Sequence, residues 1–299
     1  MRTAAGRGPR HRRVSINAGA ARSAPLLAIA RTSATARSDV AMARKDSVLL
    51  MALMDELPGR IEASFIGALA GEHAAGTAAG TADFVGVAES AAACGGFDDA
   101  DLRQRGLERP SRAGAAGLLL RALPFGLLSP LNRPRLRRDA YRCVAMAGAD
   151  EGTAVTAVAA ALLIADLLRF DLETSLVRVR QSLLEDAPMA LLDRLRVVDG
   201  GPALDVSDPD PGLTLQRAIC ALATENPFDD VLAAAAGGTA VAASLAGALV
   251  GARDGGPAVA GVDRDHLPHA DRALGVAHRL ADVAVSGLPA TPDAVPQGG

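Results

Sequence analysis

The stretch from Gly237 to Gly256, "GGTAVAASLAGALVGARDGG", could belong to a membrane span or to a buried helix of a globular protein. The choice between these two structures decides the fold. The residues from Val231 to Ala252 carry no charge, and such a run is long enough to cross a bilayer. Most of them are Ala and Gly, which gain little free energy in lipid, and the pair Gly237–Gly238 divides the run. The sequence therefore favours a buried helix; a small-residue-rich membrane or structural protein is the alternative.

Small residues recur at every fourth position within this stretch. Ala243, Gly247 and Gly251 fall on one side of a helix. Because that side carries no large side chain, a second helix can approach it closely. We therefore expect a buried helix over residues 239–252, with Gly247 at its closest contact.

The composition of the 299-residue chain favours packed helices. Hydrophobic residues make up 49%, enough for a sizeable core, but aromatic residues make up only 2% and Trp is absent. The core must therefore consist mainly of Ala, Leu and Val, whose small side chains allow helices to pack tightly. No segment alternates apolar and polar residues as a half-buried strand does. The predicted fold class is all-α.

Helical periodicity recurs from residue 46 onward without a linker, which predicts one domain over residues 46–285. The first helix is expected to end at Pro58, since proline lacks the backbone N–H that continues a helix. A later helix is expected to begin at a capping Thr81 and to end at Gly95–Gly96. The predicted helices cover residues 46–57, 59–72, 81–94, 133–148, 150–170, 171–186, 187–198, 213–224, 229–236, 239–254 and 268–285.

The two ends of the chain differ from this domain. Residues 1–45 hold ten basic residues and one acid, and residues 286–299 are rich in Pro and Gly. We expect a disordered basic extension, or a start assigned upstream of Met42 or Met51, and a disordered tail. The domain itself is acidic, which argues against nucleic-acid binding. Three distant cysteines without CxxC spacing indicate reduced thiols in a cytoplasmic protein.

Several segments occur in the order found in one known family. They are "RIEASFIGALAGEHAAG" (60–76), "GTADFVGVAESAAACGGFD" (80–98), "SRAGAAGLLLRALPFGLLSP" (111–130), "AMAGADEGTAVTAVAAALLIADLL" (145–168), "GGTAVAASLAGALVGARDG" (237–255) and "PHADRALGVAHRLADVAV" (268–285). Together they resemble the ADP-ribosylglycohydrolases, the group that includes the dinitrogenase reductase-activating glycohydrolases. The resemblance implies a compact, all-α, orthogonal helical domain of about a dozen helices, with the active cleft at helix ends.

For intact members the resemblance also implies two Mg²⁺ or Mn²⁺ ions and cleavage of ADP-ribose from a protein side chain or related nucleotide. The family's metal-binding aspartates correspond here to Ala79, Gly80, Gly238 and Ala240. None of these residues has a side-chain oxygen, whereas Mg²⁺ prefers carboxylate ligands. We therefore expect no metal site and no cofactor.

Other positions of the family's cleft are kept. The resemblance implies that a remnant of the substrate cleft is formed by Gly117, Arg121, Asp150, Gly237, Gly238 and Thr239. Ala116 replaces an asparagine of the family. This pattern retains the scaffold and removes the metal ligands, and it predicts a catalytically degenerate member that acts as a binding or regulatory module. Its partner would be an ADP-ribose-like ligand or a protein, with no role for nucleic acid or membrane.

An active enzyme with altered chemistry is the alternative. Glycosidic bonds can be cleaved by two carboxylates without metal, and Glu72 and Asp83 are the acids near the first two motifs. His73 could act as an acid or base there. These three residues are the candidate catalytic groups; the simpler interpretation is that they are polar residues near a cleft.

A second cluster of possible metal ligands lies in "GVDRDHLPHADR" (261–272). His266 and His269 are separated by Pro268, so they do not share a helical face as zinc-binding histidines do. We expect a surface loop with a helix cap rather than a metal site.

Overall fold

The computed structural model describes residues 26–77, 80–199, 201–204, 209–224, 227–237 and 239–288, with side chains from Met51 onward. The chain divides into two compact units between Val48 and Leu49. The prediction that residues 1–45 lie outside the fold concerns the first unit. Residues 1–25 lie outside the described part, and residues 26–45 are helical.

Helices account for all the regular structure of the described residues, and none of these residues forms a strand, which confirms the all-α prediction. The helices are α1 (Leu26–Ala75), α2 (Thr81–Cys94), α3 (Asp99–Gln104), α4 (Gly114–Leu128), α5 (Arg133–Met146), α6 (Glu151–Leu167), α7 (Leu172–Leu183), α8 (Met189–Arg194), α9 (Pro211–Ala223), α10 (Phe228–Ala236), α11 (Ala240–Asp254), α12 (Ala270–Ser286) and the short 3-10 helices η1 (Gly256–Val259) and η2 (Arg264–His266).

Helix α1 continues through Pro58, so the predicted end of a helix there is wrong. The missing N–H of Pro58 costs one hydrogen bond, but the helix keeps one apolar side in the core on both sides of the proline. Leu53, Leu57 and Ile61, each four residues apart, are all buried. Packing of this continuous apolar side outweighs the local preference of proline.

Helix α2 starts differently from the prediction and ends as expected. Its N-cap is Gly80, in a left-handed conformation with φ of 93°, and it makes no side-chain cap hydrogen bond. Thr81 is instead the first helical residue and is buried. Gly95 ends the helix with φ of 69°, the conformation that glycine adopts most readily.

Helix α11 crosses α1 at very short range, as the small-residue spacing predicts. A Cβ atom on Gly247 would lie 2.0 Å from the carbonyl oxygen of Gly67, and one on Gly251 would lie 2.2 Å from that of Ala63. A Cβ atom on Gly71 would lie 2.3 Å from the carbonyl oxygen of Ala243. The contacts pair rising numbers in α1 with falling numbers in α11, so the two helices are antiparallel. Residues from Val241 to Ala252 are all buried, which confirms the predicted helix.

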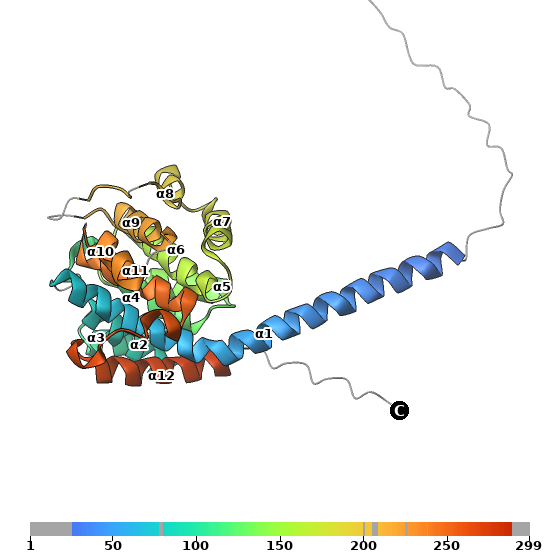
Figure 1. The fold of residues 1–299 in the computed structure, drawn as a ribbon, viewed down its shortest axis with the longest axis horizontal. Helices are drawn as coiled ribbons and strands as arrows, with labels where there is room; N and C mark the ends of the chain where they lie inside the picture. Colours follow the sequence, from blue (N-terminus) through green and yellow to red (C-terminus); the bar gives the residue numbers. More distant parts are fainter. Residues whose placement is uncertain are drawn as a thin grey trace, which may run out of the picture. The chain divides into compact units, whose positions relative to one another are not determined.

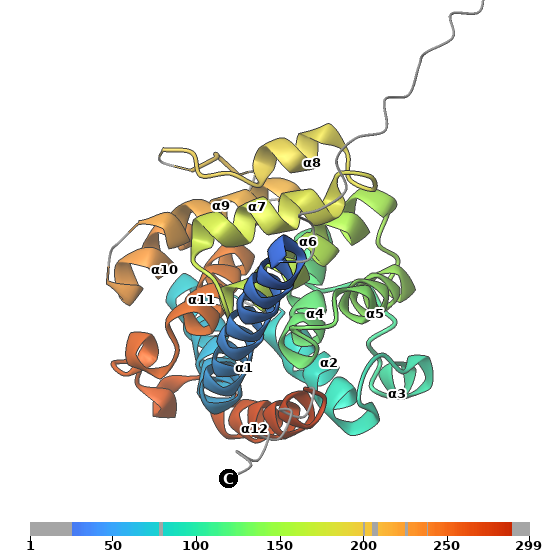
Figure 2. The ribbon, with the colours of Figure 1, turned by 90° about the vertical axis from the view of Figure 1, so that its right-hand side faces the viewer.

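Helices α4 and α6 form the centre of the core (Figures 1 and 2). Residues Ala116–Leu128 of α4 and Thr153–Leu167 of α6 are buried without exception. The two helices touch closely where a Cβ atom on Gly126 would lie 2.3 Å from the carbonyl oxygen of Ala161. Figure 2 shows α7, α8 and α9 grouped together, with α10 and α11 beside α9.

The membrane alternative finds no support in the helices of the described residues. None of them combines the length and the apolar character that crossing a bilayer requires.

Candidate functional site

The beginnings of several helices gather at one end of the core. Since α11 runs antiparallel to α1, its first turn lies beside the last turn of α1. Helix α2 turns back along α1, with the rings of Phe65 and Phe84 4.5 Å apart, so it also begins at this end. The N-terminus of a helix carries partial positive charge from its unpaired N–H groups and favours anions. This end of the core is therefore suited to a negatively charged ligand.

Ser111 joins the beginnings of α2 and α4. Its Oγ atom lies 3.4 Å from where a Cβ atom of Gly80 would be, and 2.3 Å from that of Gly117. Any side chain at Gly117 would therefore displace Ser111, which is buried. The same Oγ accepts a hydrogen bond from the backbone N–H of Ala113, at 3.3 Å. Packing against Ser111 therefore explains why a glycine occupies position 117, without any role in ligand binding.

Asp83 and Arg121 form an ion pair between α2 and α4. Asp83 Oδ2 accepts hydrogen bonds from Arg121 Nη2 at 2.7 Å and Nε at 3.1 Å. The guanidinium also donates through Nη1 to the carbonyl oxygens of Leu107 and Arg109, at 2.9 and 2.7 Å. The Arg121 side chain is 3% exposed and that of Asp83 is 26% exposed. A buried arginine needs such partners, so the ion pair gives both residues a structural role.

Three further positions of the cleft remnant cap helices. Asp150 is the N-cap of α6: its carboxylate accepts a hydrogen bond from the backbone N–H of Thr153 at 2.7 Å, which lowers the pKa of Asp150. Thr239 is the N-cap of α11, and its Oγ1 accepts from the N–H of Ala242 at 3.1 Å. Gly237 ends α10. Capping therefore gives all three residues a structural role. The first turns of α6 and α11 also leave backbone N–H groups that point outward from the helix.

The remaining candidates lie near the same end or outside the described residues. Glu72 and His73 occupy the last turn of α1, beside the first turn of α11; Glu72 is half-buried and His73 is exposed. Gly238 and Ala79 lie outside the described residues. The structure therefore brings Glu72 and His73 to the end where α2 and α11 begin, and pairs Asp83 with Arg121.

The described residues do not fit a binuclear metal centre. Gly80 and Ala240 carry no side-chain oxygen, and the hydroxyl of Thr239 already caps α11. Within the described part of the chain, no three His, Cys, Asp or Glu side chains come together closely enough to bind a metal ion. Two divalent ions require several carboxylates for charge and coordination.

The histidine-containing loop lies on the surface, where Asp263 caps the short helix η2, whereas His269 at the start of α12 makes no side-chain cap hydrogen bond. Asp263 accepts a hydrogen bond from the backbone N–H of Asp265 at 3.1 Å and contacts His266 Nδ1 at 2.8 Å. His266 is 75% exposed. His269 precedes α12 with φ of 59°.

The helical core agrees with comparisons against known proteins. A family model described as ADP-ribosylglycohydrolase matches residues 54–288. The chain belongs to the ADP-ribosylglycohydrolase family. Among solved structures, an ADP-ribosylglycohydrolase-related protein complex superposes with a TM-score of 0.65 at 21% identity, covering 77% of this chain and 99% of that chain. At that identity the likeness shows the shared fold. No curated protein matches the sequence.

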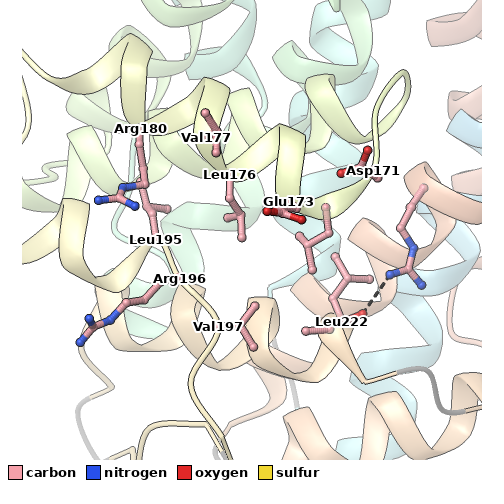
Figure 3. Close-up of a pocket in the computed structure, with 12 residues that line it drawn as sticks. Asp171, Glu173, Leu176, Val177, Arg180, Leu195, Arg196, Val197 and Leu222 are labelled. Carbon is pink, nitrogen blue, oxygen red and sulfur yellow. Dashed lines mark hydrogen bonds between the residues drawn. The ribbon is translucent and has the colours of Figure 1, made fainter.

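This family member also has a cavity that the sequence motifs do not indicate. It has a volume of about 1060 Å³ and lies between α7, the segment after α8 and the last turns of α9 and α11 (Figure 3). Arg253, in the last turn of α11, lines it, whereas Thr239 caps the first turn of the same helix. At 1.5 Å per residue these two positions are about 20 Å apart, so the cavity is separate from the helix-end site. Its lining comes from four segments far apart in sequence, which no local motif reveals.

Proposed function

We propose that this ADP-ribosylglycohydrolase-family protein is a catalytically degenerate binding or regulatory module. Its ligand, an ADP-ribose-like anion, would bind where α2, α4 and α11 begin, without divalent metal. The observation that carries the proposal is the chemistry of Gly80 and Ala240, which correspond to two of the family's metal-binding aspartates and offer no carboxylate. The pairing of Asp83 with the buried Arg121 supports it, because it engages one of the acids at this end of the core.

The binding part of the proposal rests on charge. Helix N-termini each favour an anion by about 0.3–1 kcal/mol, and several of them converge here. In place of the family's aspartates and metal ions, the N–H groups of these helix N-termini would attract the diphosphate of ADP-ribose directly. Loss of the carboxylates removes their repulsion toward phosphate, so metal is no longer needed to neutralise them.

The test is isothermal titration of the full chain with ADP-ribose, in EDTA and again in millimolar Mn²⁺. We expect equal affinity in both buffers. Ala240→Asp, which places a negative charge at the start of α11, should weaken binding in EDTA several-fold. The matched control Ala190→Asp, on the exposed surface of α8, should leave it unchanged.

Three outcomes would overturn the proposal. Binding that requires Mn²⁺ would mean that a metal site exists. Absence of ADP-ribose binding in both buffers would show that the proposed ligand is wrong. Steady release of ADP-ribose from an ADP-ribosylated peptide in EDTA would establish the alternative, a metal-independent hydrolase using Glu72, His73 or Asp83.

A further inference from the structure

The cavity beside α7 has an apolar floor. Leu176 of α7, Leu195 after α8 and Leu222 of α9 are each less than a tenth exposed and lie beneath its opening. Figure 3 shows the α7 side chains on one wall and the segment containing Leu195 and Val197 on the other. The cavity is open to solvent rather than enclosed, so it has the form of a groove.

Apolar side chains also stand exposed on both rims of this groove. Val177 on α7 and Val197 on the opposite wall are each 48% exposed. Large exposed apolar residues are few among the described side chains, and here two of them face one hollow. Apolar groups gathered around a concave surface are typical of a site that another molecule covers.

The charges of the groove are arranged by end. Arg180 and Arg196 lie on the same side of the view in Figure 3, and neither has an ion-pair partner among the described residues. Asp171 lies toward the opposite end, where its carboxylate caps α7 by accepting hydrogen bonds from Thr174. The guanidinium of Arg253, which also lines the groove, already forms an ion pair with Asp254 and donates a hydrogen bond to the carbonyl oxygen of Leu222. The free positive charge is therefore concentrated at the Arg180 end.

We propose that this groove binds an amphipathic acidic segment of a partner protein. Apolar side chains of that segment would cover Leu176, Val177 and Val197, and its carboxylates would reach Arg180 and Arg196. Complementary charge at one end sets the orientation, and apolar contact on the floor supplies affinity. The α7 wall from Asp171 to Arg180 is about 14 Å long, the length of two to three helical turns.

Size and charge favour a peptide segment over other ligands. A volume of about 1060 Å³ in an open groove is at or above the upper end for small-molecule pockets, about 300–1,000 Å³. The acids Asp171 and Glu173 lie on the same wall away from Arg180, so the groove does not suit a uniformly negative ligand such as a nucleic-acid backbone. The carboxylates of the bound segment must therefore lie at the Arg180 end.

A displayed library of random dodecapeptides, selected on the immobilised full chain, tests the proposal without a known partner. We expect enrichment of sequences that combine Leu, Ile, Phe or Met with Asp or Glu. Synthetic copies of the enriched peptides, measured by fluorescence anisotropy, should lose about tenfold or more in affinity for Val177→Asp. The double variant Arg180→Glu/Arg196→Glu should weaken them similarly, and high salt should weaken binding to the unmodified chain.

Two matched controls separate the groove from general charge effects. Met189→Asp also places an acid at an exposed apolar position, 70% exposed, outside the groove. Arg109→Glu/Arg112→Glu makes the same charge change on exposed residues elsewhere. Both should bind as the unmodified chain does. Failure to enrich any sequence, enrichment without acidic residues, or peptides indifferent to Val177→Asp would each overturn the proposal. None of these readouts involves ADP-ribose, so the outcome is independent of the proposed function.

Discussion

Replacing Gly247 by alanine adds one methyl group at the closest contact between α1 and α11. That Cβ atom would lie 2.0 Å from the carbonyl oxygen and 2.6 Å from the carbonyl carbon of Gly67, whereas ordinary contacts begin at 3.4 Å. Both obstructing atoms belong to the backbone, so no side chain can rotate away. The helices must separate, and separation also loosens the contacts of Gly71 and Gly251, one turn away on either side.

The expected sign is opposite to that of helix propensity. Alanine in a helix is favoured over glycine by about 1 kcal/mol. Overpacking of a core costs about 1–3 kcal/mol, and here it disturbs three adjacent contacts, so we expect Gly247→Ala to lower the free energy of unfolding. Gly247→Leu should lower it further. Gly59→Ala, in α1 with no atom within 4 Å of its new Cβ, should instead raise it by about 0.5–1 kcal/mol.

Urea unfolding followed by circular dichroism at 222 nm measures both variants, since the chain has no Trp to report by fluorescence. Equal stabilisation by Gly247→Ala and Gly59→Ala would refute the close crossing of α1 and α11.

Three further predictions concern single side chains. Asp83→Ala should destabilise the fold by about 3 kcal/mol because it leaves the buried Arg121 unpaired, and adding Arg121→Met should restore much of that loss; a harmless Asp83→Ala in urea unfolding would contradict the structural role. Asp150→Ala should cost about 1 kcal/mol at neutral pH, and because the folded-state pKa of Asp150 is lowered, this difference should vanish as the pH falls through that pKa; a difference that persists in acid would be inconsistent with capping. Burial raises the pKa of Cys143 to about 12, so iodoacetamide at pH 8 should label the exposed Cys94 in the native protein and reach Cys143 only after unfolding, as mass spectrometry of the digests would show.

Periodicity and small-residue spacing predicted most of the fold. The side of α11 formed by Ala243, Gly247 and Gly251 could be recognised because a helix repeats locally, and Gly95 marked the end of α2 for the same reason. The predictions at Pro58 and Thr81 are wrong because tertiary packing outweighs the local preference of these residues. Residues before and after Pro58 pack in the core. Thr81 is buried, and Gly80 adopts the left-handed conformation that precedes α2.

The site was harder to predict because its chemistry depends on partners distant in sequence. The sequence marked Asp83 as an acid near a motif, but its pairing with Arg121, thirty-eight residues later, emerges only when α2 packs on α4. The groove at Leu176, Leu195 and Leu222 joins separate segments and has no motif. A weak signal for it exists in α7, where the exposed Val177 does not fit a purely solvated helix face.

The most direct test of the central claim is thermal unfolding of the unmodified chain during Mn²⁺ titration, with ADP-ribose release measured on the same samples. A ligand specific for the native state stabilises it by about 2.7 kcal/mol at one hundred times its dissociation constant, so a tight binuclear site would show clearly. We predict no saturable shift and no release. Restoring the acids by Ala79→Asp, Gly80→Asp, Gly238→Asp and Ala240→Asp together should create a Mn²⁺-dependent rise in melting temperature. A saturable rise in the unmodified chain, accompanied by ADP-ribose release that EDTA abolishes, would contradict the loss of the metal site.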